Sequence, residues 1–345
     1  MDHASPAALA DLHLTLEQAT DYASRVLQRF GANAANAAAT ARALIAAEAD
    51  GLGGHGLTRL PSYSAMVASG KIDGHAVPRA WRAAPAVLAV DAGNGFAYPA
   101  LELGLPQLEA IAREAGIGLM AVRRSNHFGV AGQPVEKLAE RGLVALAFTN
   151  APASIAPAGG RRAVFGTNPL AFATPLRGRP PAVVDLSVSK VARGPILAAA
   201  QRGDAIPEGW ALDSDGNPTT DAKAGLAGTM VPMGEAKGTA LAFIIEVMAA
   251  AITASTFAAD MPSLFDGEGP PPAIGHVVIA IDPARIAGAA YLDHIERLAA
   301  LIEDEPGARL PGTRRVANRE RAAREGVTVG AGLRKALAHI GFTVE

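Results

Sequence analysis

The segment GLGGHG, Gly51 to Gly56, decides how the fold of this chain must be interpreted. It matches G-x-G-x-x-G, the pattern of a dinucleotide-binding Rossmann turn, in which glycines connect a strand to a helix whose N-terminus binds a pyrophosphate. The residues before it, ATARALIAAEAD, favour a helix and not an apolar strand, and Pro61 follows within five residues. The context fails on both sides, so we predict that this match is not a Rossmann site.

A different chemistry fits the same segment. Glycines end the preceding helix and let the backbone approach another group closely. His55, Arg59 and Tyr63 are spaced four apart, so a helical turn that begins at His55 would place them on one face. Histidine exchanges a proton near neutral pH, and arginine holds a carboxylate with two parallel hydrogen bonds. On spacing alone, a capping histidine and a surface arginine are the simpler explanation.

The composition excludes several classes of function. The 345 residues contain no cysteine, which excludes disulfides, thiolate zinc sites, iron–sulfur clusters and cysteine nucleophiles. The eight histidines show no metal-ligand spacing, and the simplest serine-hydrolase and phosphate-loop motifs are absent, so we expect no metal. A net charge of -2 argues against a nucleic-acid partner, whereas a small anionic substrate is compatible with a local basic pocket.

We expect a cytoplasmic protein that does not enter a membrane. The N-terminal residues MDHASPAALADLHLTLEQ lack the basic and apolar regions of an export signal. The most apolar segment, Thr239 to Ser255, is slightly short for a bilayer span and carries Glu246 near its middle. A buried helix explains this segment better.

The predicted secondary structure changes near residue 118, from mainly helices to mainly short strands. Before it, the pattern predicts a helix that ends at Gly31 and an Ala-rich helix that follows. It also predicts an amphipathic helix from Leu101 to Glu114, which Gly116 ends. After it, short apolar runs alternate with Gly, Pro and Asn, which is typical of buried strands joined by polar loops. These runs are GLMAV, LVALAFT, LAFATP and AVVDLS. A polar, turn-rich stretch, a helix over Lys237–Ser255, the strand HVVIAIDP and a further helix near residues 289–305 follow.

Four loops carry polar residues that suit ligand binding. SNHFG places His127 just after a predicted strand, where ligands often bind in α/β proteins, although a lone histidine there is more often structural. Thr167 and Asn168 offer hydrogen-bonding groups, and a plain turn explains them equally well. Asp185 follows an apolar run and suits either the orientation of a histidine or a helix cap. RLPGTRR, residues 309–315, suits a phosphate clamp or a solvated basic loop.

Taken in order, seven segments resemble the type-2 malate/L-lactate dehydrogenase family over roughly residues 15 to 340. The segments are HGLTRLPSY, SNHFGVAG, GTNPLAFATP, DLSVSKVARG, IPEGWALDSDGNPTTD, EAKGTALAFIIEVMAA and RLPGTRR. This family includes sulfolactate, malate and ureidoglycolate dehydrogenases, diketogulonate reductase and Δ1-piperideine-2-carboxylate reductase. The motifs are highly specific for the family and weakly specific within it.

The resemblance implies an α+β fold with a family-specific NAD(P)-binding domain that is not Rossmann, in agreement with the failed fingerprint. It also implies a homodimer whose active site lies near the boundary between domains and subunits. In this division, residues 1–118 form the N-terminal helices and a mixed substrate and dimerisation domain. Residues 119–280 form the NAD(P)-binding domain, and residues 281–345 return to the first domain.

The resemblance further implies roles for individual residues. His55 matches the acid/base histidine of the family, Arg59 the partner of the substrate carboxylate, and Asp185 would complete a proton relay. His127 matches a catalytic or nicotinamide-contacting histidine. The remaining substrate-binding residues are Tyr63, Thr167 and Asn168. The implied cofactor contacts are His127, Phe128, Gly129, Ser187, Ser189, Lys237, Pro311, Gly312, Arg314 and Arg315.

Two positions depart from the family pattern. Gly54 stands where members commonly have serine, which in the imine reductases joins the proton relay. Proton delivery here would run from His55 and Asp185 alone, or a water or another residue would replace the hydroxyl. Glu235 adds a negative charge where many relatives read G-G-x-K-G.

We therefore predict an enzyme that transfers a hydride from NADH or NADPH to C2 of a small 2-oxo acid of the malate, lactate or sulfolactate type. Protonation by His55 would accompany this transfer. The alternative is a reductase of the cyclic imines Δ1-pyrroline-2-carboxylate and Δ1-piperideine-2-carboxylate, and a remote alternative is a non-catalytic ligand-binding relative. The arginines of RLPGTRR slightly favour NADP(H), because they suit a 2'-phosphate, but contact with the pyrophosphate would serve NAD(H) equally.

Overall fold

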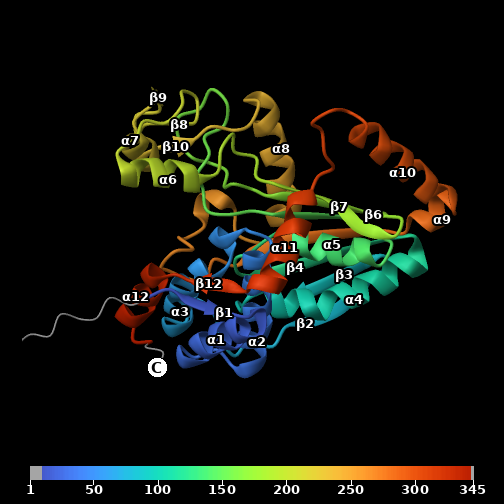
Figure 1. Ribbon diagram of the computed structural model, residues 1–345, viewed down its shortest axis with the longest axis horizontal. Coiled ribbons are helices and arrows are strands. Elements are labelled where there is room, and N and C mark those ends of the chain that lie inside the picture. Colours follow the sequence, from blue (N-terminus) through green and yellow to red (C-terminus); the bar gives the residue numbers. More distant parts are fainter. Residues whose placement is uncertain (1–9, 343–345) are drawn as a thin grey trace, which may run out of the picture.

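The computed structural model describes residues 10–342 and is built around one mixed sheet of seven strands (Figure 1). The strand order is β2-β3-β4-β11-β5-β6-β7, in which only β3 and β4 pair in parallel. The strands are β2 (Arg79–Ala84), β3 (Val87–Asp91), β4 (Ile117–Ser125), β5 (Val144–Thr149), β6 (Leu170–Leu176), β7 (Arg179–Leu186) and β11 (Ile274–Ile281). Because a Rossmann sheet is mostly parallel, this order confirms an α+β fold of another kind.

The central strands are buried on both faces, which explains their nearly continuous apolar sequences. In β11, Val278 lies in the core on one side of the sheet and Val277 in the core on the other. Helices α4 (Ala97–Ala115) and α5 (Gly132–Glu140) cover the first side. The second side is covered by α8 (Ala236–Glu246) and the π-helical turn η3 (Val247–Ala251).

Three N-terminal helices form a separate core. They are α1 (Leu16–Arg29), α2 (Ala34–Ala49) and α3 (Leu60–Ala68). A capping box between Thr15 and Gln18 starts α1, and the Asn33 side chain caps α2. The C-terminal part of the chain returns to these helices. There β12 (Val327–Val329) pairs antiparallel with β1 (Leu12–Leu14), and α12 (Ala331–His339) packs on α3.

A boundary at residue 118 runs through the sheet. Strands β2 and β3 precede this residue, and β3 pairs with β4 on its other side. Hydrogen bonds therefore join the two sides of the predicted boundary directly, and the division into three units stays a prediction.

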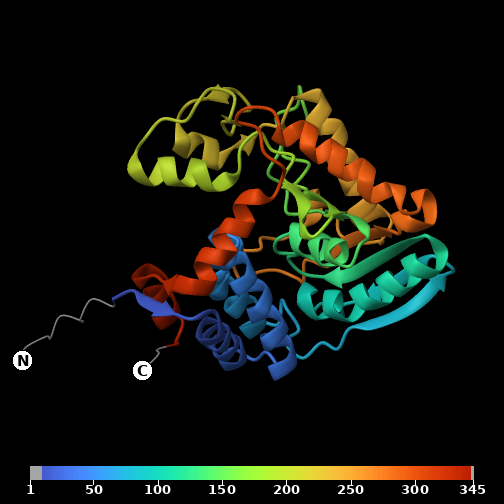
Figure 2. The same cartoon turned by 45° about the vertical axis from the view of Figure 1, so that its right-hand side comes forward.

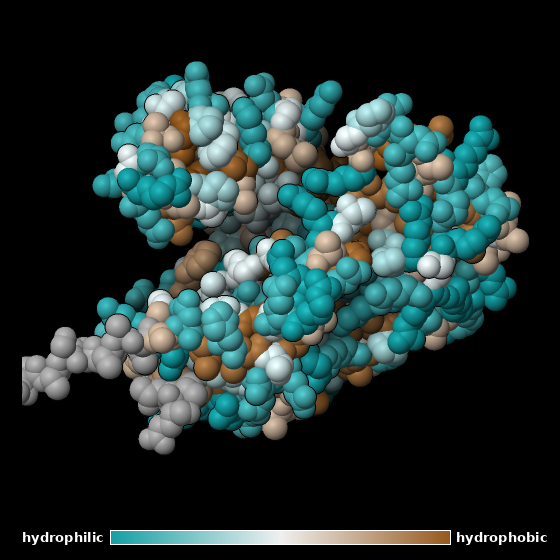
Figure 3. Space-filling view, viewed as in Figure 1, coloured by the Kyte–Doolittle hydropathy of each residue, from teal (hydrophilic) through white to brown (hydrophobic). Residues whose placement is uncertain are grey.

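The chain between β7 and α8 forms a small lobe with its own three-stranded sheet, in the order β10-β8-β9. Its elements are α6 (Arg193–Arg202), β8 (Ala211–Leu212), β9 (Pro218–Thr219), α7 (Ala222–Ala227) and β10 (Thr229–Met230). The space-filling view in Figure 3 shows a hollow between this lobe and the part of the molecule that contains the N-terminal helices.

The segment after β11 crosses the edge of the sheet and then returns. It contains α9 (Pro283–Ala287), α10 (Ala290–Glu303) and α11 (Thr313–Glu325). Ion pairs from Arg179 to Glu296 and Glu303 tie α10 to the edge strand β7. Figure 2 shows α11 running from the α10 side back to the N-terminal helices, so it connects the two main parts of the molecule.

The predicted strands are present, and the predicted helix ends at Gly31 and Gly116 both have the left-handed backbone that favours glycine. The helix expected over Lys237–Ser255 changes into the π-helical turn after Glu246. The sequence pattern does not predict α3, because Pro61 argues against a helix there. Pro61 lies in the first turn of α3, where its missing N–H breaks no hydrogen bond.

No helix within residues 10–342 is long and apolar enough to cross a membrane. Residues 1–9, on which the expectation of no export signal partly rests, lie outside the described residues.

Candidate active site

The GLGGHG segment connects two helices, α2 and α3, so a helix and not a strand leads into it, which confirms that it is not a Rossmann turn. It forms two short 3-10 turns, Gly53–His55 and Leu57–Arg59. The carboxylate of Glu48, near the end of α2, accepts a hydrogen bond from the Leu57 N–H at 2.6 Å. Gly56 lies so close that a Cβ there would collide with Glu48. The glycines therefore let the loop fold back onto α2.

Two histidines from distant parts of the chain meet at this loop. His55 ends the first 3-10 turn, and His127 follows β4. Their rings stack with centroids 5.6 Å apart and planes inclined by 18°. The Tyr63 hydroxyl of α3 lies 2.7 Å from His127 Nδ1. The structure thus brings His55, Tyr63 and His127 together. His55 and Tyr63 do not share one helical face, because His55 lies in a 3-10 turn and Tyr63 in α3.

Both imidazoles are held neutral. Desolvation by surrounding protein atoms, followed by the Arg59 cation, lowers the pKa of His55 to about 4. Desolvation also lowers the pKa of His127 well below its usual range, and Arg59, His55 and His276 add to this effect. Near pH 7 each ring therefore has one nitrogen that donates a hydrogen bond and one that accepts.

Arg59 is the cation of this cluster. Its Nε donates to the Gly54 carbonyl at 2.8 Å, and its guanidinium carbon lies 4.9 Å from the centre of the Phe265 ring. Arg59 forms no ion pair within residues 10–342, so its terminal nitrogens remain available. A carboxylate is the ligand that matches a guanidinium with two parallel hydrogen bonds.

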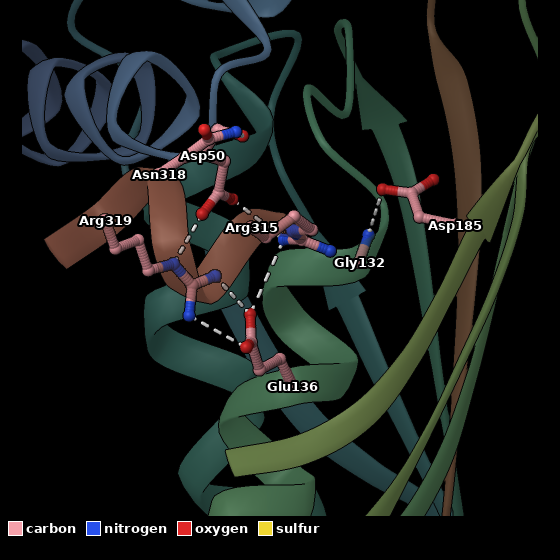
Figure 4. A network of polar contacts seen from close by, with 7 residues as sticks. All are labelled: Asp50, Gly132, Glu136, Asp185, Arg315, Asn318 and Arg319. Carbon is pink, nitrogen blue, oxygen red and sulfur yellow. Dashed lines mark hydrogen bonds and ion pairs between the residues drawn. The ribbon is translucent and has the colours of Figure 1, made fainter. Parts of the chain in front are cut away.

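The structure does not place Asp185 against His55, as the expected relay requires. Asp185 Oδ2 accepts a hydrogen bond from the Gly132 N–H at the start of α5, at 2.8 Å (Figure 4). Burial raises the pKa of Asp185, opposed by the Gly132 amide and the Arg315 cation. The end of β7 lies against α5, which is why the carboxylate contacts this helix. The Nδ1 atom of His127 contacts Tyr63 instead.

Arg315 belongs to a buried ion-pair network that the sequence pattern does not predict (Figure 4). Its Nη2 donates to Asp50 at 2.8 Å, and Arg319, one helical turn later, donates to both Asp50 and Glu136. The Asp50 and Glu136 side chains are almost fully buried. Arg315 is therefore paired inside the protein through Nη2, whereas its Nε and Nη1 atoms have no hydrogen-bond partner within residues 10–342. Its contact with a cofactor stays a prediction.

This network also connects the two histidine loops. Asp50 immediately precedes the loop that carries His55, and Glu136 lies in α5, which follows the loop that carries His127. Both carboxylates bind the same two arginines of α11. The spacing of RLPGTRR and the residues after it, with arginines four apart on α11, is the sequence signal that points to this contact.

Asn168 is buried and is held by the carboxylate of Glu246. Its Nδ2 lies 2.7 Å from Glu246 Oε2, and Nδ2 of Asn150 lies 3.0 Å from Oε1. The Oδ1 atoms of both amides are buried and have no hydrogen-bond partner in the described part of the chain. They are acceptors for a ligand that carries N–H or O–H groups. The neighbouring Thr167 accepts the Val188 N–H through its backbone carbonyl at 2.9 Å.

His276 is a third histidine near the pair, and sequence reasoning missed it because it lies within the apolar run of β11. Its Nδ1 lies 2.8 Å from Thr149 Oγ1, and its Nε2 lies 3.1 Å from the Asn126 carbonyl. The Phe128 ring packs on it at 4.5 Å. Burial lowers the pKa of His276 to about 3, so it is neutral. Through its contacts with the Asn126 carbonyl and the Phe128 ring, His276 holds the SNHFG loop against β11.

Several predicted cofactor residues gather at the N-terminal end of α8. The hydroxyls of Ser187 and Ser189 lie 2.9 Å apart. A hydrogen bond from the Met233 N–H to the Val188 carbonyl, at 2.8 Å, joins their loop to the segment that begins α8, where Lys237 is exposed. Hydroxyls, a lysine and the free N–H groups of a helix N-terminus suit a phosphate group.

Two buried polar atoms just before His127 in the chain could bind a further part of the cofactor. Ser125 Oγ and Asn126 Nδ2 are buried and have no hydrogen-bond partner within residues 10–342. A polar ligand group such as a carboxamide satisfies atoms of this kind. The residues present therefore fit a nicotinamide cofactor that carries phosphates.

The other predicted cofactor residues lie at the start of α11, beside Val183 of β7. The Pro311 carbonyl accepts the Val183 N–H at 3.2 Å. Gly312 has a left-handed backbone and packs against the Val183 backbone, where a Cβ would be crowded. Arg314 is exposed and forms no ion pair within the described residues. Arg314 is thus more accessible to an external phosphate than Arg315.

Comparisons with known proteins agree with one another. The family model described as malate/L-lactate dehydrogenase matches residues 14–338. A (2R)-3-sulfolactate dehydrogenase (NADP(+)) from Chromohalobacter salexigens is 50% identical over 306 residues, which are 89% of this chain and 91% of the relative. A Δ1-pyrroline-2-carboxylate/Δ1-piperideine-2-carboxylate reductase from Pseudomonas aeruginosa is 43% identical over 328 residues, 94% of this chain and 98% of the relative. The crystal structure of Δ1-piperideine-2-carboxylate reductase from Pseudomonas syringae covers 96% of this chain and 100% of its own, with a TM-score of 0.89 and 36% identity.

Proposed function

The chain belongs to the malate/L-lactate dehydrogenase family, and from this premise we propose that it reduces a small 2-oxo acid at C2 with NADPH and catalyses the reverse oxidation. The observation that carries the proposal is the pair of stacked, neutral histidines, His55 and His127, beside the unpaired guanidinium of Arg59. A substrate with a carboxylate next to a C=O group engages both parts at once. The relative named (2R)-3-sulfolactate dehydrogenase (NADP(+)) supports a 2-hydroxy acid product and NADP(H).

Arg59 binds the substrate carboxylate and thereby fixes which face of C2 is presented for reaction. Its Nε–H is already bonded to Gly54, so the guanidinium is held in place before substrate arrives. Stacking on Phe265 further restricts its motion. This preorganisation reduces the entropy lost on binding.

The two histidines act on the oxygen of C2. His55 is the more exposed of the two and takes up protons from solvent. Its protonated form, favoured when negative charge develops beside it, delivers a proton to the oxyanion and returns to the neutral imidazole. General-acid help of this kind accelerates a reaction by about 10²–10⁴. His127, held at Nδ1 by Tyr63, donates a hydrogen bond to the same oxygen.

The nicotinamide cofactor supplies the hydride when it is bound. Ser187, Ser189, Lys237 and Arg314 would hold its phosphates. Phe128, Gly129 and the polar atoms beside His127 would hold its reactive end.

Reduction of a cyclic imine is the second candidate function. It is favoured by the names of the relative from P. aeruginosa and of the structure from P. syringae, both of which are imine reductases. A C=N group next to a carboxylate uses Arg59 and the histidines in the same way. Against it stands Gly54, which lacks the serine hydroxyl of the imine reductases. A Cβ at Gly54 would meet nothing within 4 Å, so no other side chain fills this position in the described chain.

Initial rates of NADPH oxidation, followed at 340 nm, test the proposal. We expect higher kcat/KM for 3-sulfopyruvate, oxaloacetate or pyruvate than for Δ1-pyrroline-2-carboxylate, and higher rates with NADPH than with NADH. Faster turnover of the imine would establish the second function instead. The control variant His55→Asn should lose about 10²-fold or more in kcat. The proposal fails if no substrate turns over with either cofactor, or if His55→Asn matches the unmodified protein.

We also propose a cytoplasmic homodimer. Five large apolar side chains in one stretch of the chain are exposed, which is typical of a subunit interface: Phe243, Ile244, Ile252, Phe257 and Phe265. Because Phe265 contacts Arg59, a partner subunit on this surface would lie close to the site. Light scattering of the purified protein measures the number of chains directly, and a mass of one chain would contradict the dimer.

A further inference from the structure

Tyr98 extends the hydrogen-bonded pair of Tyr63 and His127 by one more hydroxyl. It lies in the first turn of α4, and its hydroxyl is 3.0 Å from that of Tyr63, which in turn is 2.7 Å from His127 Nδ1. Both tyrosines are buried. The roles assigned above do not use Tyr98.

This chain of hydroxyls has a direction, because each phenol carries only one proton. If His127 donated from Nδ1 to Tyr63, then Tyr63 would donate to Tyr98, and the Tyr98 proton would have no acceptor within residues 10–342. In the opposite direction, Tyr98 donates to Tyr63 and Tyr63 donates to Nδ1, so every proton has an acceptor. A buried O–H without an acceptor is destabilising, and the second direction is therefore favoured.

The direction determines the tautomer of His127. An imidazole that accepts a hydrogen bond at Nδ1 carries its proton on Nε2. Burial raises the pKa of Tyr63 and of Tyr98, and desolvation lowers that of His127, so no phenolate–imidazolium pair competes with this neutral arrangement. Nε2 makes no hydrogen bond within the described part of the chain and is free to donate to a ligand.

The loop of His127 is shaped around the Tyr98 hydroxyl. Gly129 has a left-handed backbone, and a Cβ at this position would lie 2.6 Å from the Tyr98 oxygen. Any larger residue at Gly129 would collide with the hydroxyl in its present position. The glycine of the SNHFG motif thus makes room for the first donor of the chain.

We propose that Tyr98 is a positioning residue, which acts through Tyr63 to hold His127 in the tautomer that presents Nε2–H to the substrate oxygen or nitrogen. The inference rests on the proposed function and adds a residue to its site. A donor held where negative charge develops stabilises the transition state more than the ground state. The expected consequence of losing Tyr98 is therefore a lower kcat and not weaker binding of the carboxylate.

The variant Tyr98→Phe removes the hydroxyl and keeps the ring. We expect kcat to fall about three- to tenfold, the usual effect of one hydrogen bond, with KM for the carboxylate substrate within twofold. Tyr22→Phe is the matched control, because Tyr22 is buried in the N-terminal core and its hydroxyl makes no hydrogen bond within the described residues. It should leave kcat unchanged.

Nitrogen NMR of histidine-labelled protein provides a readout that a merely structural role would not change. In the unmodified protein and in Tyr22→Phe, we expect the His127 signals, identified by their loss in His127→Gln, to be those of the Nε2–H tautomer. In Tyr98→Phe they should shift toward a mixture of tautomers. The proposal is overturned if the unmodified protein shows the Nδ1–H tautomer, or if Tyr98→Phe leaves the signals unchanged. These spectra need no turnover, so they test Tyr98 even if the substrate panel shows the proposed function to be wrong.

Discussion

Replacing Arg59 with methionine should lower kcat/KM for the 2-oxo acid by about 10²–10⁴-fold. A hydrogen bond to a charged group contributes about 1.5–3 kcal/mol, two such bonds are lost, and each 1.4 kcal/mol is tenfold. Methionine retains much of the apolar stem that packs near Phe265, so the loss reports the charge. Steady-state kinetics of the purified variant provides the measurement. A kcat/KM within threefold of the original would show that Arg59 does not bind the substrate.

The same variant should change the pH dependence of the reverse reaction. Oxidation of the 2-hydroxy acid needs a neutral imidazole to accept the proton, so its kcat/KM falls as pH drops through the pKa of His55. After desolvation, the Arg59 cation is the second cause that lowers this pKa from 6.5 to about 4. Without the cation the pKa rises, and the fall in rate should occur at a higher pH. Arg59→Lys keeps the charge and should leave the profile in place while recovering only part of the rate.

Replacing Arg319 with methionine should destabilise the fold by about 3–5 kcal/mol, because it removes one of the two cations that pair with two buried carboxylates. Glu136 loses its main cation, and Asp50 retains only Arg315. The free energy of unfolding, measured in urea, provides the test. We also expect a lower kcat in the folded variant, because Asp50 and Glu136 adjoin the loops of the two histidines.

Arg42→Met is the matched control for this experiment. Arg42 pairs with Glu102 at 2.7 Å, but both side chains are about half exposed. An exposed pair contributes roughly 0–1 kcal/mol. Equal losses of stability in the Arg42 and Arg319 variants would contradict the view that burial gives the α11 network its importance.

Much of the fold follows from local sequence patterns. The apolar runs predict β4–β7 and β11, and the glycines at residues 31 and 116 predict helix ends, because both signals act over a few residues. The pairing of β11 between β4 and β5 joins segments more than 100 residues apart, and no local pattern encodes it. The sequence pattern does not predict the role of the α11 arginines for a related reason. They resemble a solvated basic loop, because their partners Asp50 and Glu136 lie far away in the sequence.

In the candidate site, too, local patterns predict some residues, and contacts between distant segments decide the others. The spacing of His55, Arg59 and Tyr63 points to a cluster, and the structure does bring them together with His127. Asp185, expected to complete the relay, contacts Gly132 instead, because the direction of a side chain at the end of a strand depends on the helix packed against it. His276 lies inside an apolar strand sequence, where nothing local distinguishes a buried neutral histidine from a ligand-binding one.

The most direct test of the account follows the hydrogen that is transferred. The protein is supplied with NADPH that carries deuterium on one face of the nicotinamide C4 and then on the other, together with the 2-oxo acid that it reduces fastest. The account predicts that one labelled form gives a product with a single deuterium at C2, and that the other gives none. Product without deuterium from either form, or turnover without NADPH, would contradict hydride transfer at this site.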